Sequence, residues 1–343
     1  MAILVTGGSG YFGSLLLARL AERTREPLWN FDLAEPDAPM QGVEFVLGDI
    51  RDPEALARAC RDVSVVHHNV AQVPLARDLK LFESVNVQGT ENLLHAALLA
   101  GVRKVVYTSS SAVYGVPRAN PISEATPPAP AEPYGRAKYE GERRCQAYIE
   151  QGLDVTIVRP RTILGHGRLG VFQILFEWVR TGANVPVLGN GGNVYQFVHA
   201  DDLAEACIRA GERQGSTSYN VGADRYGTMR EMLEALCAHA KTGSRVRSVP
   251  AWPTVSLMKA AAALGLSPLA PYHALMYGRS MFFDVTKTKS ELGWKPRYSN
   301  QEMIIDSYDW YLRNRDSVLA SHGGSRHRSP VPLGILDLVR RLL

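Results

Sequence analysis

The chain has few cysteines, little net charge and no long apolar run. Its four cysteines, among 343 residues, are scattered without metal-site spacing, which is typical of reduced thiols in a cytosolic protein. No uncharged apolar stretch reaches the ~18 residues that a membrane span needs, and the N-terminus resembles a strand rather than a signal peptide. A formal net charge of +4 is too small to favour nucleic acid. We therefore expect a cytoplasmic protein with no membrane span and no nucleic-acid partner.

Short β-branched runs instead alternate with helical patterns through the first half of the chain. Strands are predicted at residues 2–5, 28–32, 43–47, 63–67, 104–108 and 155–158, and helices at 13–23, 83–100 and 132–151. Residues 117–133 hold too many prolines for a regular element and are expected to form a loop. The pattern predicts an α/β fold with a doubly wound parallel sheet of the Rossmann type.

The alternation weakens after Arg159, where glycines and prolines interrupt it. We expect a dinucleotide-binding domain over 1–160, to which some later segments return, and a smaller, mixed substrate lobe over 161–320. Residues 321–343 are interpreted as a polar, flexible linker followed by an amphipathic tail. The tail could dock on its own protein or on a subunit, with attachment to a membrane surface as the alternative.

A glycine-rich turn follows the first predicted strand and opens a helix, with glycines at 7, 8, 10 and 13. Glycines in this context let the backbone approach a pyrophosphate, whose charge the helix N-terminus favours. Asp32 ends the second strand, where a carboxylate accepts hydrogen bonds from the adenosine ribose and repels a 2′-phosphate. The turn therefore predicts NAD rather than NADP, unless Arg19 or Arg23 reaches the ribose. The alternative for Asp32 is a solvated residue at a strand end.

Tyr134 and Lys138 stand four residues apart in a predicted helix, so they share one face. An ammonium beside a phenol favours the phenolate, and an unperturbed tyrosine, which ionises near pH ~10, needs that help to act as a base. The pair could be a chance spacing on a surface helix. The serine run 109–111 and the glycine turn upstream favour a catalytic group.

Further motifs extend this pattern over residues 2–296. They are residues 48–52, 86–90 and 107–115, Tyr134 with Lys138, Arg159-Pro160, and residues 197–204. In these motifs the chain resembles the extended short-chain dehydrogenase/reductase family, in its NAD-dependent epimerase/dehydratase branch. The resemblance implies an enzyme with a cofactor lobe and a small lobe that closes over the substrate. It also implies a homodimer through the helices that contain 91–100 and 134–151.

The resemblance assigns catalysis to Ser110, Tyr134 and Lys138. Ser110 stands three residues before Val113-Tyr114-Gly115, where the family keeps its catalytic hydroxyl. The implied NAD contacts are Gly7, Gly10, Tyr11, Phe12, Gly13, Asp32, Asp49, Ile50, Val70, Ala71, Asn86, Thr108, Tyr134, Lys138 and Pro160. No metal is expected, because no cluster of carboxylates and histidines has ligand spacing.

The substrate motifs depart from those of sugar-nucleotide epimerases. Thr162 stands where an asparagine is usual, and residues 194–196 lack the arginine that binds a diphosphate. Arg161 is one replacement cation, and the predicted substrate residues are Ser111, Thr162, His166, Arg168, Gln196 and Arg279. These departures resemble the 3β-hydroxysteroid-dehydrogenase-like branch, and residues 255–277 could line an apolar pocket or form a core helix.

We therefore expect hydride transfer on a secondary alcohol, with a nucleotide-diphosphate sugar as the leading substrate, as in a UDP-sugar 4-epimerase. The first alternative is an NAD-dependent dehydrogenase of a steroid-like or other hydrophobic alcohol. A third hypothesis is a non-catalytic dinucleotide sensor, although such a protein has no need of Ser110, Tyr134 and Lys138.

Overall fold

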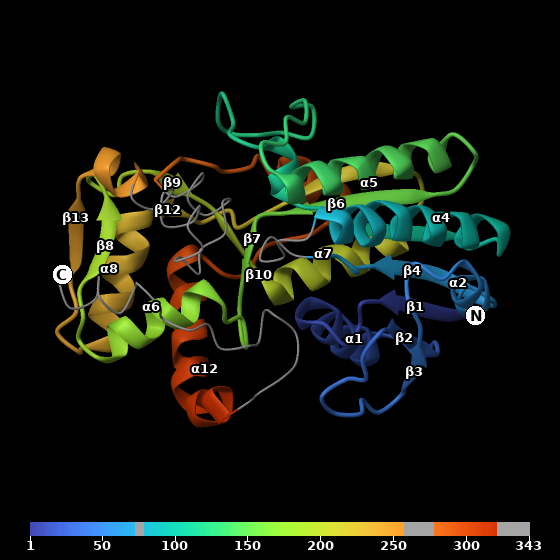
Figure 1. Ribbon diagram of the computed structural model, residues 1–343, viewed down its shortest axis with the longest axis horizontal. Helices are drawn as coiled ribbons and strands as arrows, with labels where there is room; N and C mark the ends of the chain where they lie inside the picture. The colour runs from blue at the N-terminus through green and yellow to red at the C-terminus, as the bar shows by residue number, and fades with distance from the viewer. Residues whose placement is uncertain (73–78, 257–277, 321–343) are drawn as a thin grey trace.

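The computed structural model describes residues 1–72, 79–256 and 278–320 (Figure 1). The linker and tail expected at 321–343, and most of the apolar segment 255–277, lie outside these residues. None of the helices within the described ranges is long and apolar enough to cross a bilayer.

A seven-stranded parallel sheet forms the centre of the fold, in the order β11-β6-β5-β4-β1-β2-β3. The strands are β1 (Ala2–Thr6), β2 (Leu28–Asp32), β3 (Val43–Leu47), β4 (Val63–His68), β5 (Lys104–Thr108), β6 (Val155–Pro160) and β11 (Thr217–Val221). This order confirms the Rossmann-type fold and all six predicted strands. Strand β11 was not predicted, because its Thr-Ser-Tyr-Asn-Val sequence lacks a β-branched run and only pairing with β6 makes it a strand.

Alternate residues of the central strands enter two different cores. Ile3, Val5 and Val106 pack in one core with α1 (Tyr11–Arg23) and α7 (Ala200–Glu212). Leu4 and Val105 pack in the other with α2 (Pro53–Ala59), α4 (Gly89–Leu99) and α5 (Pro133–Ile149). Side chains of a strand point alternately to its two faces, so the helices cover both sides of the sheet (Figure 1).

The helix predicted at 83–100 begins with a different geometry. A short helix α3 (Leu79–Leu81) leads into a π-helical turn, η1 (Phe82–Gln88), and only then into α4. Thr90 Oγ1 donates to the Asn86 carbonyl at 2.8 Å, and the Asn86 amide is engaged outside the helix. Such π turns often occur at functional sites, and here the turn presents Asn86 to the loop after β4.

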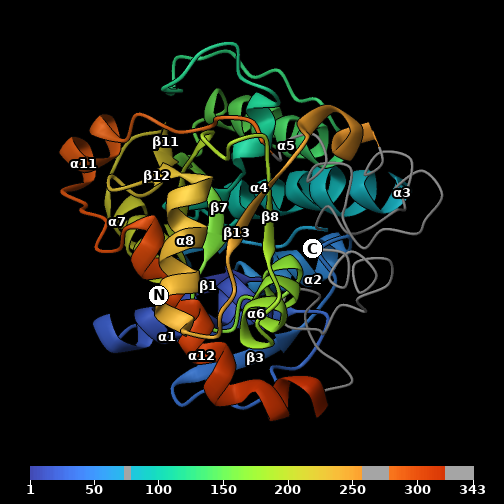
Figure 2. The same ribbon diagram turned by 90° about the vertical axis from the view of Figure 1, so that its left-hand side faces the viewer.

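The C-terminal part of the chain mixes helices with short strand pairs, as predicted. Its elements are β7 (Thr162–Leu164) with β10 (Phe197–His199), β8 (Val185–Leu188) with β13 (Val246–Val249), β9 (Val194–Tyr195) with β12 (Gly227–Thr228), α6 (Val171–Arg180), α8 (Met229–Ala240), α11 (Thr286–Leu292) and α12 (Asn300–Ala320). Figure 2 shows α8 beside α12 and the β8–β13 pair. The domain boundary at residue 160 stays a prediction, while β11 and α7 do lie with the main sheet.

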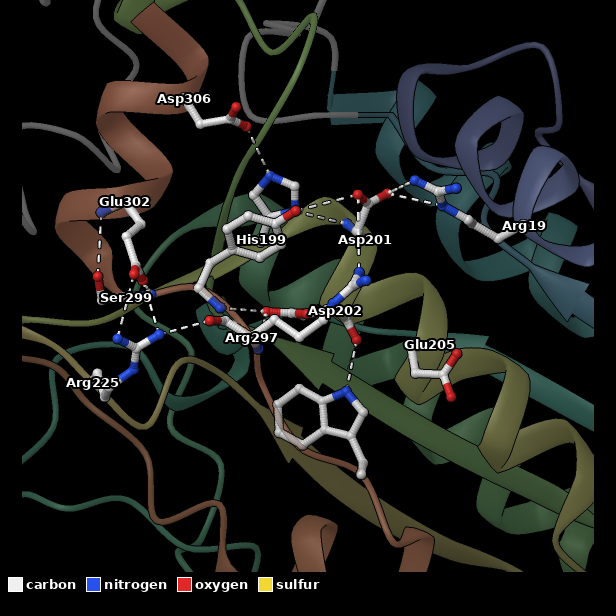
Figure 3. Close-up of polar contacts among 12 residues, drawn as sticks. Arg19, His199, Asp201, Asp202, Glu205, Arg225, Arg297, Ser299, Glu302 and Asp306 are labelled. Carbon is white, nitrogen blue, oxygen red and sulfur yellow. Dashed lines mark hydrogen bonds and ion pairs between the residues drawn. The ribbon is translucent and has the colours of Figure 1, made fainter.

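The motif at 197–204 joins this part of the chain to the sheet layer (Figure 3). His199 is the N-cap of α7 and accepts a hydrogen bond from Asp201 N at 3.2 Å. Asp201 binds Arg19 of α1 at 3.0 Å, and Asp202 accepts from Arg297 N at 2.9 Å and Arg297 Nε at 3.1 Å. The charges at the start of α7 thus position α1 and the segment before α12 around it.

Candidate functional site

The glycine turn has the shape that a dinucleotide pyrophosphate requires. Gly7 has φ +72°, and a Cβ at Gly13 would lie 2.1 Å from the Gly7 carbonyl oxygen, so no larger residue fits there. Helix α1 begins at Tyr11, and its N-cap, Gly10, supplies no side-chain cap. A helix N-terminus without a side-chain cap favours an anion such as a pyrophosphate. Tyr11 is buried and Phe12 is half-buried in the first turn.

Asp32 lies beside this turn, as the sequence predicts for a ribose ligand. Its Oδ2 accepts from Ser9 N at 3.0 Å, and burial raises its pKa while backbone N–H groups lower it. Arg19 is paired with Glu22 and Asp201, and Arg23 with Glu205 and Glu212. With both arginines paired elsewhere, nothing in these contacts softens the expected rejection of a 2′-phosphate.

Asp49 and Ile50 continue from the strand next to Asp32. Gly48 N donates to the Asp32 carbonyl at 3.0 Å, which brings Asp49 to the same strand ends. Hydrogen bonds from Arg51 lower the pKa of the Asp49 carboxyl. Ile50 is only 3% exposed and packs in the core, where a Cβ at Gly89 would lie 2.6 Å from its Cγ2. In the structure the Ile50 side chain therefore supports the start of α4.

The loop after β4 closes the other side of the turn. A Cβ at Gly7 would lie 3.0 Å from Val70 N, so half-buried Val70 and Ala71 run close to the glycines. Asn86 holds this loop, accepting from Gln72 N at 2.7 Å and donating to Gln72 O at 3.1 Å. The predicted cofactor residues thus gather where the strand order reverses between β1 and β4, the usual place for a ligand in such sheets.

Thr108 and Pro160 end the neighbouring strands β5 and β6. Thr108 Oγ1 donates to Asn69 Oδ1 at 2.6 Å, which ties the end of β5 to the end of β4. Pro160 is buried as the last residue of β6. Both residues lie at the carboxyl edge of the sheet, together with the glycine turn.

Tyr134 and Ser110 come together at the end of β5. Pro133 starts α5, and the Glu132 carboxylate caps it by accepting from Tyr134 N at 2.8 Å and Gly135 N at 2.5 Å. Ser110 is the N-cap of the short helix η2 (Ser111–Tyr114). Burial raises the pKa of the Tyr134 phenol to about 12, while side-chain hydrogen bonding with Ser110 lowers it. Sequence reasoning missed Glu132, although an acidic residue before an N-terminal proline is a recognisable cap.

Lys138 contacts the end of β5 rather than the phenol. Its Nζ donates to the Thr108 carbonyl at 2.8 Å and lies 4.8 Å from the centroid of the Tyr107 ring. Burial lowers the pKa of Lys138 to about 8. The positive charge of Arg168 lowers the pKa of Tyr134, but burial has the larger effect and the net shift is upward. In the structure the Lys138 ammonium is directed to a backbone carbonyl, and its effect on the pKa of Tyr134 stays a prediction.

Arg159 and Glu142 form a buried ion pair that holds Ser109 of the serine run. Arg159 Nε and Nη2 donate to the Glu142 oxygens Oε1 and Oε2 at 2.8 and 2.7 Å, and Ser109 Oγ donates to Oε1 at 2.6 Å. Arg159 Nη1 also donates to the Tyr114 hydroxyl at 2.8 Å. Sequence reasoning missed Glu142, although it stands four residues after Lys138 on the same helix face. This group holds Ser109 and Tyr114 on both sides of Ser110.

Two of the six predicted substrate residues, Ser111 and Arg168, lie beside the catalytic candidates, and a third, Thr162, contacts Tyr195. Ser111 follows Ser110 and accepts from Arg161 Nη1 at 2.9 Å. Arg168 has its guanidinium 5.5 Å from the Tyr11 ring centroid and acts electrostatically on Tyr134. Thr162 Oγ1 lies 3.0 Å from the Tyr195 hydroxyl, across from Arg161.

The other three make contacts of a different kind. Gln196 is fully buried, and its amide donates to the Ala223 carbonyl and accepts from Phe283 N at 2.8 Å. These backbone contacts occupy the side chain, so in the structure it holds strands together. His166 pairs with Asp306 at 2.6 Å near the surface, and Arg279 is exposed.

Comparison with known proteins gives the site its family. The model of the NAD-dependent epimerase/dehydratase family matches residues 3–222. The chain belongs to this family. It is an NAD-dependent enzyme of the extended short-chain dehydrogenase/reductase type, and the uncapped N-terminus of α1, the crowded glycines and Asp32 fit that cofactor.

Two relatives match over nearly the whole chain. An uncharacterized protein of Sinorhizobium fredii is 53% identical over 98% of this chain and 85% of its own length. The UDP-glucose 4-epimerase of Mycolicibacterium smegmatis is 31% identical over 92% of this chain and 99% of its own length.

One solved protein, MoeE5, shows the same fold with ligands bound. It has been solved with UDP-glucose and NAD, at a TM-score of 0.73 and 25% identity, and with UDP-glucuronic acid and NAD, at 0.74 and 26%. Each comparison covers 92% of this chain and 100% of that one. Within the ranges described for the present chain, no three His, Cys, Asp or Glu side chains gather as a metal site.

Proposed function

We propose that this enzyme transfers hydride at a secondary alcohol of a nucleotide-diphosphate sugar, as a UDP-sugar 4-epimerase does. The observation that carries the proposal is the meeting of Ser110 and Tyr134 at the strand ends, beside the glycine turn. The similarity to a UDP-glucose 4-epimerase and to a protein that binds UDP-sugars with NAD supports the substrate class.

The glycine turn and Asp32 would hold NAD, which would supply the acceptor for the hydride of the carbinol carbon. Tyr134 takes the hydroxyl proton, and Ser110 donates a hydrogen bond to the same oxygen. With a pKa of about 12, the phenol holds its proton at neutral pH, and each unit of lowering needs about 1.4 kcal/mol of differential interaction. Arg168 supplies positive charge toward Tyr134, and we propose that Lys138, four residues along the same helix, adds to it when substrate and cofactor are bound.

A dehydrogenase of a hydrophobic alcohol is the second candidate. Thr162, in place of the usual asparagine, shares its hydroxyl with Tyr195, which favours a pocket with fewer polar groups for a sugar. The third hypothesis, a non-catalytic sensor, loses its basis because the family is enzymatic and the catalytic candidates lie together.

The deciding experiment assays the purified protein with UDP-, dTDP- and GDP-sugars, after measuring how much NAD copurifies. We expect retained NAD and conversion of at least one nucleotide sugar without added cofactor. Turnover of an apolar secondary alcohol with stoichiometric release of NADH, and of no nucleotide sugar, would overturn the proposal in favour of the second candidate.

We further propose a cytoplasmic homodimer that forms through α4 and α5. The four buried, free cysteines support a reducing compartment. The two helices pack side by side, with Arg144 3.5 Å from Glu91, and Leu99 at the end of α4 is 74% exposed. Light scattering of the wild type and of Leu99→Asp tests the interface, since a monomeric wild type contradicts it.

A further inference from the structure

Arg161 is a buried arginine in which two of the three guanidinium nitrogens are unpaired. Arg161 is only 1% exposed. Nη1 donates to Ser111 Oγ at 2.9 Å and contacts Met281 Sδ at 3.2 Å. Nε and Nη2 have no hydrogen-bond partner, and no carboxylate in the described part of the chain pairs with the guanidinium. A buried cation without a counter-charge is costly, so it needs an explanation.

Aromatic rings supply part of that explanation. The guanidinium lies 4.6 Å from the Tyr195 ring centroid and 5.6 Å from that of Phe283. Such rings attract a cation to their faces. They do not accept the in-plane hydrogen bonds of Nε and Nη2, which a guanidinium directs along its edge. The rings therefore stabilise the charge but leave Nε and Nη2, which are buried, without an acceptor.

Arg159, two residues earlier, shows how this chain pairs a buried arginine. Its Nε and Nη2 hold the two oxygens of Glu142 at 2.8 and 2.7 Å. The unpaired atoms of Arg161 are the same two, Nε and Nη2. This edge of a guanidinium matches a carboxylate in a bidentate pair. A carboxylate from outside the chain would complete Arg161 as Glu142 completes Arg159.

Arg161 lies against the serine that follows the proposed catalytic serine. Arg161 follows Pro160, the last residue of β6, and bonds to Ser111. Ser111 follows Ser110, whose hydroxyl meets Tyr134. Arg161 thus contacts the residue that follows Ser110, one of the groups proposed to act on the carbinol. A diphosphate is less suited, because it carries more charge than one fork and one hydroxyl can bind.

We propose that Arg161, supported by Ser111, binds a carboxylate carried by the sugar itself, so that the preferred substrate is a nucleotide-linked uronic acid. This inference rests on the proposed function. Ser111 accepts from Nη1 and fixes the guanidinium, while Nε and Nη2 donate to the two carboxylate oxygens. A neutral hydroxymethyl group at the same position offers a single oxygen and no charge.

The test compares UDP-glucuronate with UDP-glucose, which differ in a carboxylate against a hydroxymethyl group. We expect kcat/KM of the wild type to favour UDP-glucuronate by at least about 100-fold, since sites built around buried polar groups reject ligands that leave them unpaired. Arg161→Met should lose that factor for UDP-glucuronate and little for UDP-glucose. Arg161→Lys, which keeps the charge but not the fork, should recover only part of it. Arg25→Met, at an exposed position two residues after the end of α1, is the matched control and should change neither.

Two results would overturn the inference. Equal or better use of UDP-glucose by the wild type, with both substrates affected alike in Arg161→Met, overturns this inference and leaves the proposed function intact. Failure of all nucleotide sugars overturns the proposed function and the inference with it. Should Arg161→Met not fold, as judged by circular dichroism and NAD binding, the wild-type preference and Arg161→Lys still decide.

Discussion

Two buried arginines beside the serine run differ in how completely the chain pairs them. Arg159 shares Glu142 with Ser109, whereas Arg161 contacts Ser111. Short hydrogen bonds form a closed group around the first arginine, with Arg159, Glu142, Ser109 and Tyr114 as its members. By contrast, Arg161 Nε and Nη2 have no partner among the described residues. The difference indicates that the first group holds the site in shape, whereas the second is arranged for a ligand. Substitutions in the Arg159 group should therefore alter stability, and substitutions at Arg161 or the proposed catalytic residues should alter activity.

The largest effect is expected at Tyr134, the proposed base. Tyr134→Phe removes the proton acceptor and should lower kcat by roughly 10²–10⁴-fold, the usual contribution of positioned proton transfer. NAD binding, measured by fluorescence titration, and the melting temperature should change little. Tyr139→Phe, on the same helix, is the control. Near-normal turnover in Tyr134→Phe would exclude this tyrosine as the base.

Glu142→Leu should show the opposite behaviour. It leaves the Arg159 guanidinium buried without a counter-charge, which costs about 3–5 kcal/mol in the free energy of unfolding. Arg161→Met removes no carboxylate's partner and should change that free energy by no more than about 1 kcal/mol. Urea unfolding of both variants measures the contrast. Similar losses in the two variants would mean that Arg161 is also a structural arginine.

Lys138 gives the comparison a pH dependence. Burial lowers its pKa from 10.5 to about 8, so above pH 8 the unfolded chain holds a proton that the folded chain has released. Stability therefore rises with pH between about 8 and 10.5, by roughly 3 kcal/mol from this group. Below pH 8 the buried ammonium exerts its full penalty. Denaturant unfolding of wild type and Lys138→Met across this range isolates the contribution, and parallel pH profiles would contradict it.

Asp32 should give the smallest of these effects. Asp32→Ala removes an acceptor for the ribose and the charge that repels a 2′-phosphate. A charge-assisted hydrogen bond contributes about 1.5–3 kcal/mol, so the preference for NAD over NADP should fall by roughly 10–100-fold. Binding of both dinucleotides to wild type and variant measures it. A wild type that already prefers NADP would show that Asp32 does not face the ribose.

Much of the cofactor side was predictable because its signals are local. The glycine spacing, the β-branched runs and Asp32 at a strand end each depend on a few consecutive residues. Strand β11 and the π-helical turn η1 were missed, since the first depends on pairing with β6 and the second on the bond of Asn86 to Gln72. The substrate side was harder to predict. The amide of Gln196 is taken up by Phe283 and Ala223, which lie far along the chain.

The sequence by itself determined the family chemistry, because the turn that receives a dinucleotide and the four-residue spacing of Tyr134 and Lys138 follow from backbone geometry and helical periodicity. Only the tertiary structure decided which charges act on the tyrosine and which arginine remains unpaired. Both depend on contacts between distant residues, such as Arg159 with Glu142 and Arg161 with Ser111. Electrostatics and pairing at a site are properties of neighbours in space, and the order of residues alone does not specify them.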